Sequence, residues 1–238
     1  MTGFLNLIAG GLALLLFAVP AALGQHPGQA ETADDHALGD PDAPLLIVEY
    51  ASFACPHCAH FQEAVWPMVK EEFVDTGRVR WVFRPMLTNP VQLAAASTIL
   101  AECAPEDRFF DAVDLLFAEQ QSLFDTARAG GDVLGVYNRI AGAVGLTPEA
   151  FMGCLQDPAM NEALNASAQQ SVEYEIPGTP AFLVGGDVLI GTNRGEGPLF
   201  YYGDEPLILN GERAPGQMDE DSFRRIILHF LNESDSEN

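Results

Sequence analysis

The stretch Ser52-Phe53-Ala54-Cys55-Pro56-His57-Cys58-Ala59-His60-Phe61 lies where an apolar run ends and a helical pattern begins. The run extends from Leu45 to Tyr50, and from Phe61 onward apolar residues recur at the spacing of one helix face. The stretch therefore predicts a turn that leads from a buried strand into the first turn of a helix.

Two cysteines occupy this turn. Cys55 is expected at the helix N-terminus, where unpaired backbone N–H groups and the positive end of the helix dipole stabilise a thiolate. Cys58 follows one turn later on the same face, which allows the two sulfur atoms to form a disulfide. The spacing predicts a redox-active dithiol in which Cys55 carries the reactive thiol.

Other interpretations of a Cys-x-x-Cys motif fit less well. A zinc site needs a second ligand pair at close spacing, whereas the remaining cysteines, Cys103 and Cys154, stand far apart. A c-type haem attachment needs His directly after the second Cys, and that position is Ala59. A purely structural disulfide seldom opens a helix after a buried strand with a His between its cysteines.

The N-terminal segment predicts the compartment. Residues 1–24 carry no charged side chain and contain an apolar run followed by Ala22-Leu23-Gly24, which is typical of a secretory signal peptide. The missing Lys or Arg near the start leaves an uncleaved membrane anchor as the alternative. We expect a periplasmic or secreted protein in either case, and in an oxidising compartment Cys103 and Cys154 are expected to form a structural disulfide.

The net charge limits the choice of partners. The chain has 34 acidic and 11 basic residues, which gives a formal charge of −23 at pH 7. Such a charge repels phosphate backbones and anionic membrane surfaces, so we expect no nucleic-acid partner. The sequence indicates no cofactor and no bound metal.

Periodicity and turn residues divide the chain into segments of an α/β fold. An apolar strand, a helix that Pro67 should kink, and an alternating strand at 78–85 imply a right-handed parallel crossover. Gly185-Gly186-Asp187 predicts the turn of an antiparallel hairpin. The expected segments are a signal peptide (1–24), a flexible lead-in (25–42), a first α/β part (43–88), an all-helical insertion (89–173), a second α/β part (174–232) with an extra lobe (191–217), and a frayed tail (233–238).

The insertion at 89–173 is expected to consist of helices. They are predicted near 91–103, 106–120, 132–144, 147–155 and 158–173, with no strand among them.

Glu49 stands at the end of a strand that should be buried on both faces, and a buried unpaired carboxylate is costly. Either its side chain turns outward or it serves proton transfer beneath the cysteines, and we favour the second interpretation.

Two segments in this order resemble one family. Glu49 to Cys58 and Ile176 to Gly186, with the helical insertion between them, are similar to the DsbA-type thiol:disulfide interchange proteins, which have a thioredoxin fold with an inserted all-helical domain. The resemblance covers roughly residues 40 to 232. It implies that Cys55 is the nucleophile, Cys58 the resolving thiol, and Glu49 the buried acid of the family.

The same resemblance implies roles for four neighbours and a function. Pro56 and His57 would tune the thiolate, and Thr179 would precede a cis proline, Pro180, that faces the disulfide. The implied function is a dithiol oxidase that introduces disulfides into secreted or periplasmic proteins. Its partners would be reduced client proteins and a quinone-linked membrane oxidase of the DsbB type, and we expect a monomer.

Two alternatives remain open at this point. The same site serves as a disulfide isomerase or reductase in related proteins, although that activity is generally coupled to dimerisation. A different class of protein would use Cys55, Cys58, His57 and His60 to bind a soft metal ion without catalysis. The long segment 191–217 departs from the family pattern, in which the last helix follows sooner.

Overall fold

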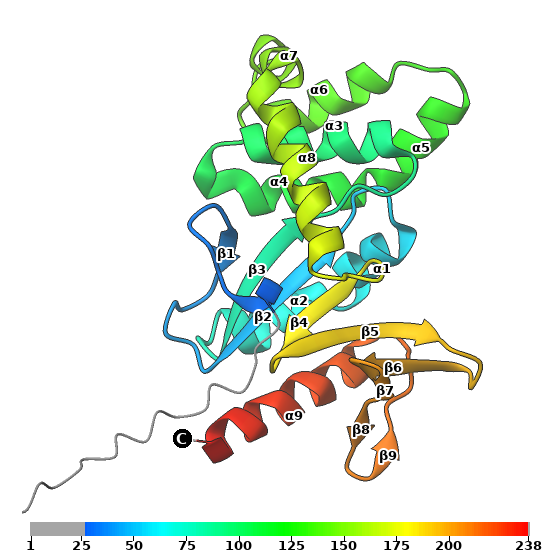
Figure 1. Ribbon diagram of the computed structural model, residues 1–238. Coiled ribbons are helices and arrows are strands. Elements are labelled where there is room, and N and C mark those ends of the chain that lie inside the picture. Colours follow the sequence, from blue (N-terminus) through cyan, green and yellow to red (C-terminus); the bar gives the residue numbers. More distant parts are fainter. Residues whose placement is uncertain (1–26, 238) are drawn as a thin grey trace, which may run out of the picture.

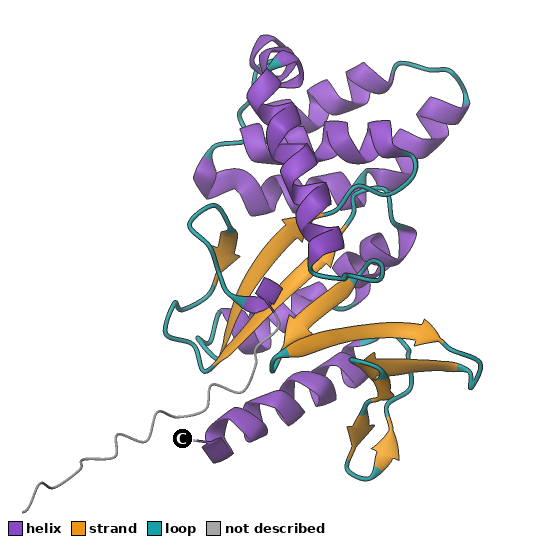
Figure 2. Ribbon diagram, in the orientation of Figure 1, coloured by secondary structure: helices purple, strands orange, loops and turns teal. Residues whose placement is uncertain are grey.

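The computed structural model describes residues 27–237, so the expected signal peptide lies outside the described residues. A seven-stranded mixed sheet, ordered β1-β3-β2-β4-β5-β6-β7, runs through the middle of the molecule, and a block of helices covers one end of it (Figure 1, Figure 2). The expected α/β fold with an all-helical insertion is confirmed.

The central unit is a strand-helix-strand crossover. Its elements are β2 (Leu45–Ala51), α1 (Pro56–Ala64), α2 (Trp66–Val69), the π-helical turn η2 (Lys70–Val74) and β3 (Val79–Pro85). β2 and β3 are parallel neighbours, with Leu45 opposite Val79. The helix steps between α1 and α2, as expected because Pro67 lacks a backbone donor.

Side chains alternate across β2 and divide the core into layers. Leu45 and Ile47 pack with the residues of α1, α2 and α9 (Glu220–Glu237). Val48 and Tyr50 belong to a separate cluster on the opposite face. Because successive side chains of a strand point to opposite faces, Glu49 lies on the same face as Ile47, which α1 covers.

The lead-in is structured, and the expectation of flexibility for 25–42 was wrong from residue 27 onward. It contains the 3-10 turn η1 (Pro27–Gln29) and β1 (His36–Leu38), which pairs antiparallel with β3. The cause is Arg84, whose guanidinium donates to Asp35 at 2.6 Å and to two backbone carbonyl oxygens of this segment. A polar sequence therefore orders because a buried cation on β3 needs acceptors.

The insertion contains more helices than expected. They are α3 (Val91–Cys103), η3 (Glu106–Arg108), α4 (Phe109–Ala118), α5 (Gln120–Arg128), α6 (Val133–Ala143), α7 (Pro148–Gln156) and α8 (Pro158–Glu173). The predicted helix at 106–120 is η3 plus α4, and α5 was not predicted, because Leu123 is its only buried apolar residue. Phe109 and Phe117 lie in the core of the block, and Cys55 and Cys58 belong to the same cluster.

The second α/β part begins with the expected hairpin. β4 (Ala181–Val184) and β5 (Asp187–Asn193) are joined by Gly185 and Gly186, whose φ angles of 59° and 100° suit a tight hairpin turn. β5 then pairs with β6 (Pro198–Tyr202), so the lobe extends the central sheet instead of standing apart from it.

The rest of the lobe consists of short strands. They are β7 (Glu205–Pro206), β8 (Ile208–Leu209) and β9 (Glu212–Arg213), with turns at Gly203-Asp204 and Asn210-Gly211. The expected tail from residue 233 is helical as far as Glu237, because α9 continues that far.

Candidate active site

The end of β2 leads directly into the turn that places Cys55 at the N-terminus of α1. After Ala51 the chain makes a turn in which the backbone N–H of Cys55 donates to the carbonyl oxygen of Ser52 at 2.9 Å. Cys55 is the N-cap of α1, with an extended backbone (φ −95°, ψ 117°), and Pro56 occupies the first turn of the helix, where no backbone donor is needed. The carbonyl oxygen of Cys55 accepts the first intrahelical bonds, from Cys58 at 3.1 Å and Ala59 at 3.2 Å.

The two thiols are both free and have opposite electrostatic surroundings. Cys55 is 8% exposed and Cys58 is fully buried. A hydrogen bond from the Cys58 thiol lowers the pKa of Cys55 to about 5, with smaller contributions from Thr179 and from the backbone N–H groups of Cys58 and His57, against the opposing effect of burial. Burial, together with the neighbouring Cys55, raises the pKa of Cys58 well above its ordinary value.

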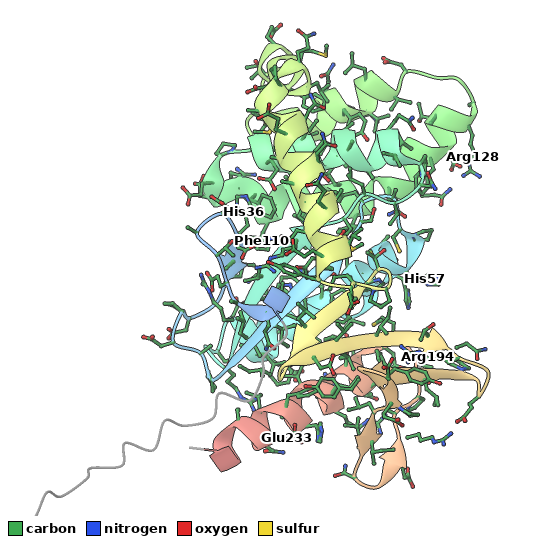
Figure 3. The ribbon with its side chains drawn as sticks, viewed as in Figure 1. His36, His57, Phe110, Arg128, Arg194 and Glu233 are labelled. Carbon is green, nitrogen blue, oxygen red and sulfur yellow. A yellow bond between two sulfur atoms is a disulfide. The ribbon has the colours of Figure 1, made fainter. Side chains whose placement is uncertain are left out.

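His57 lowers the pKa of Cys55 through its backbone N–H. Its side chain is exposed, in the first turn of α1 (Figure 3), and its backbone N–H is one of the groups that lower the pKa of Cys55. A positive helix terminus, and not an imidazolium contact, therefore accounts for its contribution in this structure.

The loop before β4 closes the other side of the site. The peptide bond between Thr179 and Pro180 is cis, and the Cys55 thiol donates to the carbonyl oxygen of Thr179 at 3.3 Å. These residues are 124 positions apart, and the pairing of β4 with β2, in which Tyr50 is opposite Ala181, brings them together.

Glu49 is buried in the position that the sequence predicted. It is 1% exposed, and one of its carboxyl oxygens, Oε1, has no hydrogen-bond partner. Burial raises the pKa of Glu49 to about 8, with a side-chain hydrogen bond to Trp81 acting in the opposite direction. The carboxyl group is therefore protonated at neutral pH, and its charge, when present, raises the pKa of Cys58.

Three polar residues around the turn were not predicted. The hydroxyl of Ser52 accepts from the backbone N–H of Ala54 at 3.2 Å and from the Thr88 hydroxyl at 2.8 Å. The buried side chain of Gln120 donates to the carbonyl oxygens of Phe53 and Cys55. No motif or periodicity in the sequence marked these three residues.

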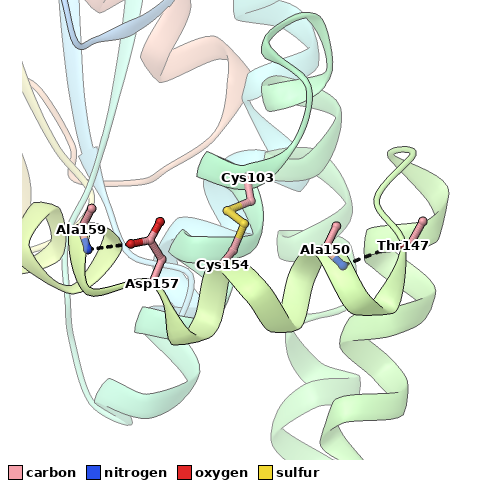
Figure 4. Close-up of a disulfide and its surroundings, with 6 residues drawn as sticks. All are labelled: Cys103, Thr147, Ala150, Cys154, Asp157 and Ala159. Carbon is pink, nitrogen blue, oxygen red and sulfur yellow. Dashed lines mark hydrogen bonds between the residues drawn. A yellow bond between two sulfur atoms is a disulfide. The ribbon is translucent and has the colours of Figure 1, made fainter.

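The second cysteine pair lies far from this turn in the helical block. Cys103, at the end of α3, and Cys154, in α7, form the expected disulfide with 6.5 Å between their Cα atoms (Figure 4). The adjoining helix starts are capped: the Thr147 hydroxyl accepts from the N–H of Ala150, and Asp157 caps α8 (Figure 4). The disulfide thus links α7 to the C-terminal end of α3.

Within residues 27–237 no group of three or more His, Cys, Asp or Glu side chains is arranged to hold a metal ion. In the same range, no helix has both the length and the apolar character that crossing a bilayer requires.

A parallel β-α-β unit, an antiparallel hairpin and a Cys-Pro-His-Cys turn that faces a cis proline define a protein of the thioredoxin-fold class with an inserted helical domain. The chain belongs to the thioredoxin family, whose model matches residues 31–197.

Several known proteins are similar to this chain in sequence or in fold. A Rickettsia bellii protein, provisionally named a protein-disulfide oxidoreductase, is 29% identical over 154 residues, which are 64% of this chain and 58% of that protein. The matched region thus spans little more than half the length of this curated relative. Wolbachia pipientis alpha-DsbA1 is 23% identical with a TM-score of 0.66, over 87% of this chain and 96% of that one. Bacillus subtilis BdbD is 20% identical with a TM-score of 0.63, over 88% and 99% of the two chains.

Proposed function

We propose that this protein is an extracytoplasmic thiol-disulfide oxidoreductase, and specifically a dithiol oxidase that transfers its Cys55–Cys58 disulfide to client proteins. The observation that carries the proposal is the placement of Cys55 at the N-terminus of α1, in contact with Cys58 and with the cis-proline loop. The Cys58 thiol, the Thr179 side chain and the first backbone N–H groups of α1 favour the thiolate, and a stable thiolate is a good leaving group in disulfide exchange.

The reaction proceeds by two exchanges. A client thiolate attacks the Cys55 sulfur of the oxidised protein, which breaks the Cys55–Cys58 bond and forms a mixed disulfide. A second client thiolate then attacks the client sulfur of this mixed disulfide. The client disulfide forms, Cys55 leaves as the thiolate, and the protein retains the two electrons as its reduced dithiol.

Glu49 supplies the proton that the first exchange needs. Cys58 is expelled as a thiolate in a buried environment that strongly favours the thiol. Glu49 is buried on the face of β2 that α1 covers and is protonated at neutral pH. We therefore assign it the transfer of a proton toward Cys58 on reduction and away from it on reoxidation.

The remaining assignments follow from the same proposal. Pro180 and Thr179 line the place where the client cysteine docks against Cys55, and Pro56 and His57 shape the helix N-terminus. The Cys103–Cys154 disulfide supports an oxidising compartment, periplasmic or secreted. Reduced proteins are the clients, the protein acts as a monomer, and a quinone-linked membrane oxidase of the DsbB type would restore the disulfide.

Three assays distinguish this function from its alternatives. The oxidised protein should form disulfides in reduced, unfolded ribonuclease stoichiometrically, and Cys55→Ser should abolish the reaction. Efficient reactivation of scrambled ribonuclease or fast insulin reduction, with little oxidation of the reduced enzyme, would instead identify an isomerase or a reductase. Stoichiometric metal after purification without dithiol turnover would identify a metal-binding module.

A further inference from the structure

Gln120 connects the helical insertion to the backbone of the catalytic turn. It is the first residue of α5 and is 5% exposed. Its side-chain nitrogen Nε2 donates to the carbonyl oxygen of Phe53 at 2.8 Å and to that of Cys55 at 3.1 Å. A primary amide has two donor hydrogens, so both are used within this one turn.

The two acceptors define the geometry of the turn. The carbonyl oxygen of Cys55 is also the acceptor for the backbone N–H groups of Cys58 and Ala59, which form the first helical turn. Its direction therefore determines how the N-terminus of α1 is oriented relative to the Cys55 sulfur. The carbonyl oxygen of Phe53 lies two residues earlier, so Gln120 fixes the chain on both sides of Ala54.

The other hydrogen bonds that hold this turn involve Ser52, whose carbonyl oxygen accepts from the Cys55 N–H and whose own N–H donates to the Cys58 sulfur. The N-cap residue has no side-chain cap, since a thiol replaces the hydroxyl or carboxylate that usually caps a helix. The Ser52 hydroxyl supports only the N–H side of the turn, through Ala54. Without Gln120, the buried Phe53 carbonyl oxygen would lose its side-chain donor and the Cys55 carbonyl oxygen would keep only its two helical N–H partners. Both oxygens would then be free to shift, and the first helical turn would move with them.

We propose that Gln120 is a positioning residue for the nucleophile: by holding the Phe53 and Cys55 carbonyl oxygens, it keeps the first N–H groups of α1 directed at the Cys55 sulfur. This inference rests on the proposed function of Cys55 but concerns a different element. It gives the helical insertion a direct effect on the reactivity of the thiol, in addition to covering the site.

The test replaces the amide by an apolar side chain of similar length, Gln120→Met, in the full chain. The alkylation rate of the reduced protein by iodoacetamide is measured against pH, with Cys58 left in place. We expect the midpoint for Cys55 to rise by about one pH unit, which is tenfold less thiolate at pH values below the midpoint. The matched control is Gln121→Met, since Gln121 is an exposed neighbour whose amide bonds to Asp125, and its midpoint should equal that of the wild type.

Two further variants keep the test decisive if Gln120→Met does not fold. Gln120→Asn retains the amide but is one methylene shorter, so it should lose at least one of the two hydrogen bonds and raise the midpoint less than Met does. Gln120→Glu retains the length but places carboxylate oxygens against carbonyl oxygens, so it should raise the midpoint at least as much as Met.

The outcomes separate this inference from the proposed function. A lower melting temperature with an unchanged Cys55 midpoint in the folded variants would overturn the inference, because it would show a merely structural role. A wild-type midpoint near that of an ordinary thiol would instead overturn the oxidase assignment, while the shift between wild type and variants would still decide the role of Gln120.

Discussion

The thiols of Cys55 and Cys58 lie one helical turn apart, yet their surroundings shift their pKa values in opposite directions. The Cys55 sulfur is the acceptor of a thiol hydrogen bond and lies at the positive end of α1, so its anion is stabilised. Cys58 is fully buried beside that anion, so its neutral form is stabilised. The reduced pair therefore holds a single negative charge, which lowers its free energy relative to the disulfide, as the proposed oxidase function requires.

A direct titration tests this asymmetry. In the reduced wild type, the alkylation rate should follow an ionisation with a pKa of about 5. In Cys58→Ala the largest stabilising contact of the Cys55 thiolate is lost, so the midpoint should move up toward the ordinary value. In Cys55→Ala the remaining Cys58 should stay unreactive at neutral pH. Faster alkylation of Cys58 than of Cys55 would reverse the assignment of nucleophile and resolving thiol.

The raised pKa of Glu49 predicts how the stability of the folded protein depends on pH. Its pKa is about 8 in the folded protein and 4.5 as the ordinary value, so between these values the folded state binds the extra proton. Stability must therefore fall as pH rises from 4.5 to 8. Oxidised protein should be used for this test, because its cysteines do not titrate.

Denaturant unfolding of oxidised wild type and Glu49→Gln across this range measures the effect. The difference in unfolding free energy should change by up to about 5 kcal/mol in favour of the variant as pH rises. Groups common to both proteins cancel in the difference. A pH-independent difference would mean that the carboxyl group titrates normally and is accessible to water.

The sequence predicted the two cysteines of the proposed active site and the buried Glu49, and it missed the side chains that hold the turn around them. Cys55 and Cys58 were predicted from their spacing at the start of a helix, and Glu49 was predicted because a carboxylate is unusual in an apolar strand. Ser52 and Gln120 were missed because their partners are backbone atoms, which carry no sequence signal. The contact between Gln120 and Phe53 spans 67 residues and depends on how the insertion docks.

At the scale of elements, the lead-in shows how a buried charge orders a polar segment. The side chains of Arg84 and Asp35 are only 7% and 8% exposed, and the guanidinium also bonds to the Tyr50 hydroxyl. Burial raises the pKa of Asp35, but the hydrogen bonds from Arg84 and Thr32 and the charge of Arg84 together outweigh it and leave the pKa below its ordinary value. No periodicity marks such a pair, so composition alone predicted a flexible segment.

Removing the acid should destabilise the fold. Asp35→Ala leaves the Arg84 cation without its carboxylate, and we expect a loss of about 3 kcal/mol in unfolding free energy. Asp34→Ala, at the exposed neighbouring position, is the matched control and should change stability by less than about 0.5 kcal/mol. Equal effects of the two substitutions would mean that the ion pair contributes nothing to docking β1.

The disulfide between α3 and α7 makes a second prediction at this scale. It closes a loop with a sequence separation of 51, for which the chain-entropy model gives about 4 kcal/mol of stabilisation. The double variant Cys103→Ala/Cys154→Ala should lose stability of this order. Mild reduction that opens the active site should release two thiols, from Cys55 and Cys58, and four thiols at that stage would contradict a stable structural disulfide.

At the scale of the whole molecule, the chain order predicted the parallel crossover, the hairpin and the insertion, because each has its own periodicity or turn residues. The continuation of the sheet from β5 to β6 and β7 was not predicted, since the Gly- and Pro-rich segment 191–217 shows no long alternation. Within it, Phe200, Leu207 and Leu209 are buried in the core beneath α9. Part of the lobe is therefore structural, while its turns remain exposed.

The register of β5 puts one of these turns, the tip at 194–197, at the catalytic end of the sheet. Leu189 pairs with Phe182, so Ile190 lies level with Ala181, and the strand continues for three more residues, about 10 Å, past that level. The turn at 194–197 therefore projects beyond the level of Pro180. It carries Arg194, which stacks on Tyr201 at 4.4 Å and is exposed in a chain with a large excess of acidic residues (Figure 3).

We predict that this tip governs the choice of client. Replacing residues 194–197 by Asn-Gly keeps a tight hairpin and leaves the buried part of the lobe in place. Oxidation of a small dithiol peptide should continue at the wild-type rate, because the chemistry at Cys55 is untouched, whereas oxidation of a reduced, folding protein should change several-fold. Asn210→Gly, in the other turn of the lobe, is the matched control. Unchanged rates for both substrates in a folded variant would show that the tip has no part in recognition and that the lobe serves only to cover α9.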